Sequence, residues 1–393
     1  MKLRFAAAFA AAAVLLAPVA LAQTGGVDQE AIAKRLVAAA GIHEGDLVMV
    51  WGGTRDFGLL EDIAIQSRAV GAHPLLTLWS QKLAHDTFTK VPERYDSQAP
   101  AMSQKLAETI TALISVDLEM DPAWSADIPP ARREARNAAG RQANATMLSR
   151  KVRIVNLGSG LFPNAQNAAL YGIPKADLEK LFWPAVAADP AQLQSTGAAL
   201  KAVLGAGREL RITHPNGTDL RVRIEGRRPM VSDGVISPEE AQAGGGENFE
   251  LLPAGEVMLA PVPGTAEGVV VAAPDTWAGK EVLDWKLTFA GGRIVSMTGR
   301  GGGFAPLKER YDAAGEGKDA FAGIDIGINP ALKLPPGIRQ QNTMPAGMVS
   351  VMAGDNTWLG GENKATFSLT AFLPGATVTV DGKPIVEKGV LKP

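Results

Sequence analysis

The chain has 393 residues, of which 46% are hydrophobic and 20% are charged, and its formal net charge is −2. That length supports a large core and two domains. The near balance of charges excludes the basic excess of a nucleic-acid-binding protein, and the absence of cysteine excludes thiol catalysis, thiolate metal sites and disulfides.

The N-terminal residues predict export. Lys2 and Arg4 form a positively charged start, an apolar run follows over Phe5–Leu16, and Ala20-Leu21-Ala22 matches a cleavage signal. We therefore expect a signal peptide over residues 1–22 and a periplasmic or extracellular mature protein. The apolar run is short for a membrane span and no later run is long enough, so we expect no membrane span in the mature chain.

The first half of the chain predicts an α/β domain with a parallel sheet. Some segments carry apolar residues at helical spacing, and others are short runs of Val, Leu and Ile bounded by turns. The strand–helix–strand order with short loops is typical of parallel sheets. The expected strands are 47–51, 73–79, 112–118 and 152–157, and the expected helices are 29–40, 59–70, 106–110, 132–148 and 174–187.

Beyond Gly205 the pattern changes to strands joined by turns that contain Gly and Asn, which predicts a β-rich, mostly antiparallel domain. We place the α/β domain at residues 23–200 and the β-rich domain at residues 201–393, with a cleft between them. The segment Gly347–Leu391 predicts two strands and then a hairpin closed by Asp381-Gly382. The other expected strands are 208–213, 219–224, 256–260, 268–273, 285–290 and 293–298.

Few side chains in the sequence offer catalytic chemistry. The four histidines form no HExxH motif and no pair at ligand spacing, and no G-x-S-x-G motif occurs. Two carboxylates stand out: Glu256 begins an apolar strand after a Pro-Ala-Gly turn, and Asp325 lies among isoleucines and glycines. A buried acid needs a partner or a cation. The alternative is that each is an edge residue hydrogen-bonded to loop amides, and the catalytic residues remain unknown at this point.

Several motifs in order along the chain resemble the aminopeptidase T and aminopeptidase S family of metallo-aminopeptidases. The resemblance is collinear over about residues 29–391, and it implies a two-domain dimer that removes N-terminal residues from peptides. In that family two divalent ions activate a water for hydrolysis. The motifs are GIHEGDLVMVW, ITHPNGTDLRVRI, LLPAGEVMLAPVPGTAEGVV, IGINP and the glycine and asparagine pattern of Gly347–Leu391.

The resemblance also assigns the metal-ligand positions, and only one of them keeps its ligand, as Glu256. The second Glu falls on Gly323, the next His on Ser350, and a His-x-Asp pair on Ser368 and Thr370. Hydroxyls and glycine are poor ligands, and one carboxylate cannot hold two dications against their hydration and mutual repulsion. We therefore expect the two-metal centre to be degenerate.

Asp325 lies two residues beyond Gly323 and so on the same face of a strand, where it restores one negative charge. Our first hypothesis is a non-catalytic or repurposed relative that binds a peptide or small ligand in the cleft and needs no cofactor. The alternative is an active hydrolase with a single zinc, cobalt or manganese ion held around Glu256 and Asp325. A third is an envelope interaction module, which predicts a cleft filled by Met344, Met348 or Trp358.

Overall fold

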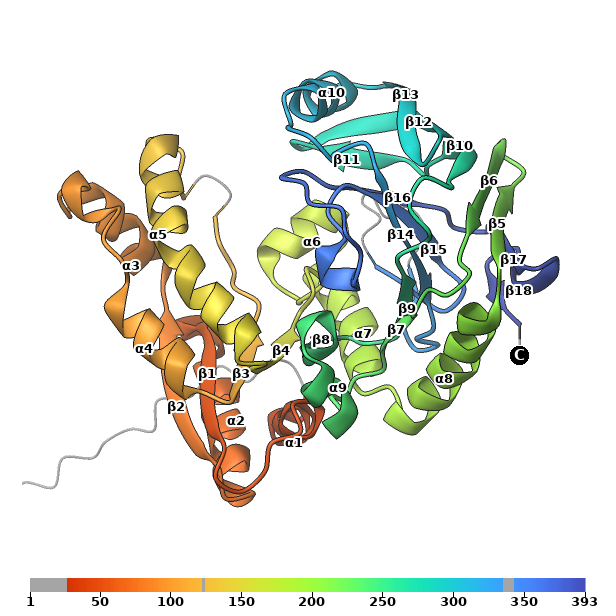
Figure 1. Ribbon diagram of the computed structural model, residues 1–393. Helices are drawn as coiled ribbons and strands as arrows, with labels where there is room; N and C mark the ends of the chain where they lie inside the picture. Colours follow the sequence, from red (N-terminus) through yellow and green to blue (C-terminus); the bar gives the residue numbers. More distant parts are fainter. Residues whose placement is uncertain (1–26, 122–123, 335–342, 393) are drawn as a thin grey trace, which may run out of the picture.

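A computed structural model describes residues 27–121, 124–334 and 343–392 of the protein (Figure 1). The expected signal peptide, residues 1–22, lies outside these residues, so its prediction stays a prediction. No helix within the described ranges has the length and apolar character needed to cross a membrane.

A parallel sheet of five strands organises the N-terminal part, in the order β2-β1-β3-β4-β8. Four of its strands match the expected ones, which confirms the α/β fold class. The fifth strand, β8, comes from the second half of the chain and was not predicted. The strands are β1 (Leu47–Gly53), β2 (His73–Trp79), β3 (Ala112–Val116), β4 (Arg153–Leu157) and β8 (Phe249–Leu252).

Helices flank this sheet, and some of them begin at a side chain that accepts a hydrogen bond from the first turn. The Asp28 carboxylate accepts a hydrogen bond from the Ala31 N–H at 3.0 Å, which starts α1. In the N-terminal half the helices are α1 (Gln29–Ala39), α2 (Phe57–Ala69), α3 (Gln81–Thr89), α4 (Ala101–Thr109), α5 (Pro130–Ser149), α6 (Ala165–Tyr171), α7 (Lys175–Val186) and α8 (Pro190–Ala206), with single turns η1 (Thr54–Asp56) and η2 (Glu93–Tyr95).

The C-terminal part is mostly antiparallel β, as the sequence predicts, and its strands form two sheets. The larger has nine strands, and Val380 pairs with Lys383 across the expected hairpin. Its strands are β5 (Glu209–His214), β6 (Thr218–Arg223), β10 (Glu267–Val271), β11 (Asp275–Trp277), β12 (Lys280–Ala290), β13 (Arg293–Arg300), β17 (Thr377–Val380), β18 (Lys383–Glu387) and β19 (Val390–Leu391). The remaining helical segments are α9 (Pro238–Ala243), η3 (Gly245–Asn248), α10 (Phe304–Asp312) and η4 (Thr357–Leu359).

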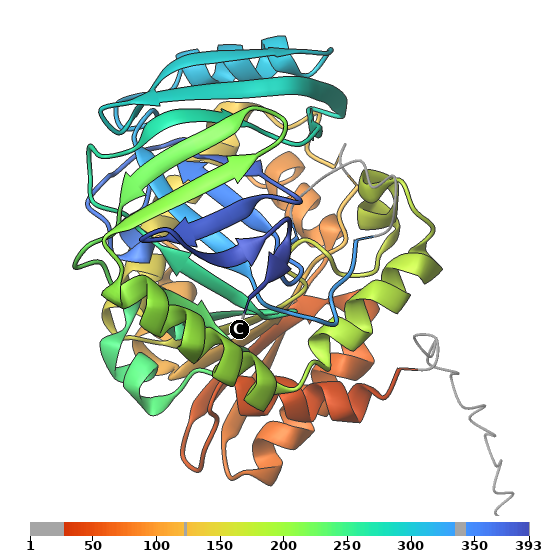
Figure 2. The same cartoon turned by 90° about the vertical axis from the view of Figure 1, so that its right-hand side faces the viewer.

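The smaller antiparallel sheet, here the central sheet, has the order β16-β15-β14-β9-β7. Figure 1 shows it between the parallel sheet and strands β5, β6 and β17, and Figure 2 shows the larger antiparallel sheet in front of it. Its strands are β7 (Met230–Ser232), β9 (Glu256–Leu259), β14 (Phe321–Gly327), β15 (Val349–Ala353) and β16 (Leu369–Phe372).

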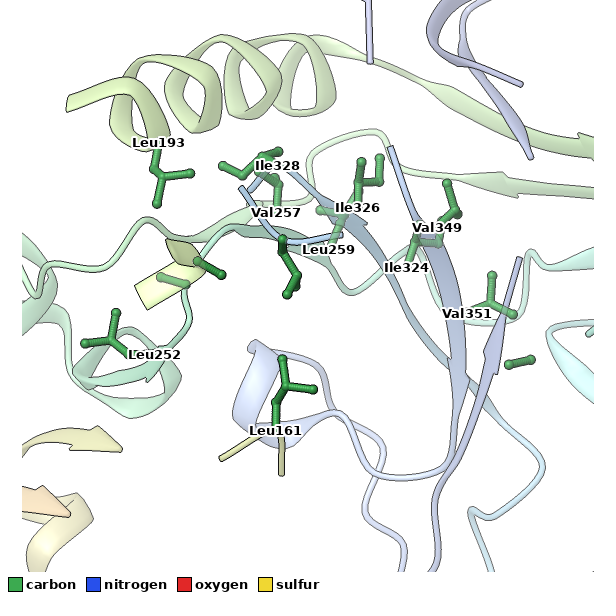
Figure 3. Close-up of a cluster of buried hydrophobic side chains, with 14 of the residues drawn as sticks. Leu161, Leu193, Leu252, Val257, Leu259, Ile324, Ile326, Ile328, Val349 and Val351 are labelled. Atoms are coloured by element: carbon green, nitrogen blue, oxygen red, sulfur yellow. The ribbon is translucent and has the colours of Figure 1, made fainter. Parts of the chain in front are cut away.

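One face of the central sheet packs into the main hydrophobic core below α8. Figure 3 shows Leu193 of α8 in the same cluster as Val257 of β9 and Ile326 of β14. Gly197 lets α8 come close to the sheet, since a Cβ there would lie 2.5 Å from Val231 Cγ1. Because side chains alternate along a strand, residues one position away from this apolar set point to the opposite face. That opposite face carries the candidate site.

Candidate functional site

Glu256 and Asp325 lie as diagonal neighbours on the central sheet. Asp325 is in register with Met258 on one side and with Ser350 on the other, while Glu256 pairs with Gly327, two residues beyond Asp325. Because Val257 and Ile326 belong to the core, the two carboxylates share the other face. The structure therefore brings together the two acids that the sequence singled out.

The surroundings of both carboxyl groups favour the protonated form over the ionised form. Burial raises the pKa of Asp325 well above its usual range, and the neighbouring Glu256 raises it further, although the N–H of Ile326 donates to it. Burial likewise raises the pKa of Glu256 to about 7. Asp325 is only 7% exposed, and its Oδ1 has no hydrogen-bond partner among the described residues. An unpaired buried carboxylate oxygen is costly, so this oxygen is ready to bind a donor or a cation.

The other expected ligand positions also lie near this face, but they serve packing and turns. A Cβ built on Gly323 would lie 2.8 Å from Met352 Cε and 3.0 Å from Leu359 Cδ2, so those side chains occupy the space where a longer side chain would project. Ser350 is 1% exposed beside Asp325. Thr370 pairs with Met352 in the sheet.

Ser368 lies just before β16 and completes a turn. Its Oγ accepts a hydrogen bond from the Asp355 N–H at 3.2 Å. Gly354 comes so close that a Cβ there would lie 2.8 Å from that Oγ. The hydroxyl thus holds the loop that precedes η4, which is a structural use of the position.

A small apolar group, here the methionine cluster, covers the middle of this face. It consists of Met230, Met258, Ala260, Met352 and Leu359. The strand alternation in EVML and VSVMA already places Met258 and Met352 on the face of Glu256 and Ser350, and this signal was missed. The side chains that the sequence analysis named as possible cleft fillers are elsewhere: Met344 and Met348 are each 5% exposed outside the cluster, and Trp358 is 42% exposed.

A two-metal centre does not fit these residues. Within the described part of the chain, no three side chains of His, Asp or Glu gather closely enough to hold a metal ion. Divalent sites need several anionic or imidazole ligands in fixed geometry, and the two carboxylates of this face are flanked by a hydroxyl and thioethers. The arrangement suits binding of a donor group better than water activation between two ions.

A second buried acidic site lies nearby and was not predicted. Glu250 of β8 is 4% exposed, and its Oε1 accepts hydrogen bonds from Ser232 Oγ at 2.6 Å and from the Gly234 N–H at 2.8 Å. Arg35 of α1 donates from Nη1 to the Gly234 carbonyl at 2.9 Å. These contacts join α1, the parallel sheet and the central sheet. Burial raises the pKa of Glu250 to about 8 and that of Asp233 to about 6.

Two solved structures share this fold. Wild-type AmpT from Thermus thermophilus is 20% identical, with a TM-score of 0.68 over 92% of this chain and 98% of that one. 2,5-Dihydroxypyridine dioxygenase from Pseudomonas putida KT2440 is 13% identical, with a TM-score of 0.59 over 95% of this chain and 98% of that one. No curated protein matches the chain.

A family model described as thermophilic metalloprotease (M29) matches residues 29–305. The match includes Glu256 and ends before Gly323, Asp325 and Ser350, so the other expected ligand positions lie beyond it. It covers well over half of the chain. The chain therefore belongs to the thermophilic metalloprotease (M29) family.

Proposed function

We propose that this protein is a member of its family that has lost the two-metal centre and binds a peptide or another small ligand without hydrolysing it. The observation that carries the proposal is the packing above Gly323, where Met352 and Leu359 occupy the space of a metal-binding side chain. Loss of that ligand leaves too few negative charges for two dications. Membership of the family supports descent from a metalloprotease. The expected substitutions at the ligand positions argue against the two-metal mechanism in this chain.

The acidic pair gives the proposed ligand its chemistry. A peptide amino terminus carries a positive charge and three N–H donors, so one ammonium satisfies both the unpaired Asp325 Oδ1 and the neighbouring Glu256. A bound cation also favours the ionised form of both carboxyl groups, which offsets the cost of burying them. We therefore infer that the ligand presents an amino group to this face.

The N-terminus supports a proposed cellular location, and the family supports a proposed oligomeric state. The charged start, apolar run and cleavage signal of residues 1–22 support a protein that acts outside the cytoplasm. The family resemblance supports a homodimer. Size-exclusion chromatography with light scattering checks the dimer, and N-terminal sequencing of protein from the periplasmic fraction checks cleavage after Ala22.

A second candidate function is hydrolysis with a single divalent ion held by Glu256 and Asp325. The unpaired Oδ1 of Asp325 favours it, because a metal ion satisfies that oxygen as well as an ammonium does. Different chemistry on this fold has support: the dioxygenase from Pseudomonas putida is named for an activity other than peptide hydrolysis. The third hypothesis, an interaction module, gains no support from Met344, Met348 or Trp358, none of which belongs to the methionine cluster.

One experiment separates the two candidates. The purified full chain is titrated calorimetrically with trialanine and with N-acetyl-trialanine, and release of alanine is then followed with added zinc, cobalt or manganese. We expect trialanine to bind intact, N-acetyl-trialanine to bind at least about tenfold more weakly, and Glu256→Gln to abolish the difference. The exposed Glu61→Gln is the matched control. Metal-dependent alanine release that is lost in Glu256→Gln would establish the hydrolase instead.

A further inference from the structure

A cavity of about 380 Å³ opens between three loops, away from the acidic pair. The loops are residues 226–230 before and into β7, residues 243–247 around η3, and residues 357–360 around η4. Neither Glu256 nor Asp325 lines it, although Met230 and Leu359 belong both to its wall and to the methionine cluster. Its volume lies within the range of small-molecule sites, about 300–1,000 Å³.

Bare backbone forms part of the cavity wall. Gly226, Gly245 and Gly360 each have a positive φ, of +73°, +67° and +73°, and a Cβ at any of them would meet no atom within 4 Å. The absence of side chains at these points lets a ligand approach the main chain. Gly246 matters for the opposite reason, because a Cβ there would lie 2.2 Å from the Trp358 carbonyl oxygen. It therefore allows η3 and η4 to close together.

The side chains of the wall combine positive charge with a flat apolar surface. Arg227 donates from Nε to the Ala260 carbonyl at 2.8 Å, which fixes its position. Arg228 Nη2 lies 3.0 Å from Glu247 Oε1 and donates to Oε2 at 3.1 Å. Two arginines against one glutamate give the wall a net charge of +1. Trp358 is 42% exposed and supplies the aromatic surface.

We propose that this cavity binds a small organic monocarboxylate that carries an aromatic group. Guanidinium groups bind carboxylates through paired hydrogen bonds, and indole rings stack on aromatic groups. A single negative charge balances the +1 wall, whereas a dianion such as a phosphate monoester brings an unmatched charge close to Glu247. The proposal stands on the cavity alone and does not depend on the proposed function at Glu256 and Asp325.

The test is a calorimetric titration of the full chain with matched probes: N-acetyl-phenylalanine, its uncharged amide, cationic phenylalanine amide, and phenyl phosphate. We expect N-acetyl-phenylalanine to bind with a dissociation constant below about 1 mM and at least tenfold more tightly than the other three. Equal binding of the anionic probe and its amide, or no saturable binding of the anionic probe, would overturn the proposal.

Two variants locate the binding. Arg228→Gln removes a cation and frees the Glu247 carboxylate, so we expect at least tenfold weaker binding of N-acetyl-phenylalanine. Trp358→Ala removes the aromatic surface and should weaken the same probe severalfold. The control is Arg223→Gln, an exposed arginine on β6 that pairs with Glu225 and lies outside the cavity wall. Unchanged binding in both cavity variants, with melting temperatures like that of the wild type, would also contradict the assignment.

Discussion

Two of the buried acids of the molecule, Glu250 and Asp325, differ in how their oxygens are paired. Glu250, at the junction of α1, β7 and β8, accepts from the Ser232 hydroxyl and the Gly234 amide. Asp325, on β14, is buried almost as deeply, but its Oδ1 has no partner among the described residues and its neighbour is another acid, Glu256. Burial raises the pKa at both sites.

We interpret this difference as the one between an acid that stabilises the fold and an acid that binds a ligand. Stability arguments explain Glu250, because it ties two sheets together through donors that would otherwise be buried without partners. They do not explain Asp325, whose arrangement costs free energy until a ligand supplies a donor or a cation. A site that costs stability and has no structural benefit is a candidate functional site.

The largest expected effect is at the paired site. Glu250→Ala leaves the Ser232 hydroxyl and the Gly234 N–H buried without their acceptor. We expect the free energy of unfolding to fall by about 3 kcal/mol, measured by urea denaturation at pH 7. Glu250→Gln keeps an oxygen in the same place and is the control, with an expected loss below about 1 kcal/mol. Equal losses in both variants would show that the hydrogen-bond acceptor at this position does not account for the contribution of Glu250 to stability.

The pH dependence of stability gives the next effect. The pKa of Glu250 is raised from 4.5 to about 8 in the folded chain, so between those values the folded state binds more protons than the unfolded state. The contribution of Glu250 to the free energy of unfolding is therefore greatest below pH 4.5. It falls as the pH rises towards 8, by up to about 1.4 kcal/mol per pH unit. The groups that face it are Ser232, Asp233, Glu240 and Arg35.

Urea denaturation from about pH 5 to about pH 8.5 measures this slope. Asp233, with a pKa of about 6, contributes in the same direction at the lower end. The Glu250→Gln variant removes the titrating proton, so its stability should fall less steeply with pH than that of the wild type. Parallel curves for the two proteins would mean that Glu250 stays ionised in the folded state, contrary to the burial argument.

A substitution at Asp325 is expected to change the free energy of unfolding in the opposite direction to Glu250→Ala. Asp325→Asn removes one of two neighbouring acids and a carboxylate oxygen that lacks a partner among the described residues. We expect the free energy of unfolding at about pH 8 to rise by about 1 kcal/mol, while the trialanine affinity falls. A loss of stability as large as that of Glu250→Ala would remove the distinction between the two sites.

The smallest effect tests the packing over Gly323. Gly323→Ala places a methyl group 2.8 Å from the flexible end of Met352, so we expect a loss of about 1 kcal/mol. In a Met352→Ala background that contact is absent, and the same substitution should cost less. The coupling energy from the double-mutant cycle, measured by urea denaturation, should be about 0.5 kcal/mol or more. Full additivity of the two substitutions would show that Met352 does not fill this space.

Much of the fold could be predicted because its signals are local. The alternation in Val349–Ala353 and the Asp381-Gly382 turn each specify an element from a few adjacent residues. The sequence does not indicate helix α8, because Ser195, Thr196 and Gly197 blur its helical periodicity, and the expected domain boundary at residue 200 falls inside it. Strand β8 was missed because it has four residues, contains Glu250 and pairs with β4, far away along the chain.

The candidate site, like the fold, could be predicted only where its signals are local. Glu256 could be named from its motif, and Asp325 from its strand face two residues after Gly323. That the two are neighbours depends on the register of β9 with β14, which no local pattern specifies. Strand alternation places Met258 and Met352 on this face. Their packing with Met230 and Leu359, and the contacts of the Glu250 site, join distant segments and follow from no local pattern.

We propose that this member of the M29 family has no two-metal centre. The most direct test of this proposal is the metal content of the purified full chain after incubation with zinc, cobalt or manganese and exhaustive dialysis, measured by inductively coupled plasma mass spectrometry. We expect no retained pair of ions, and equal metal content in the wild type and Glu256→Gln. Two ions retained per chain, lost in Glu256→Gln together with peptide hydrolysis, would contradict it.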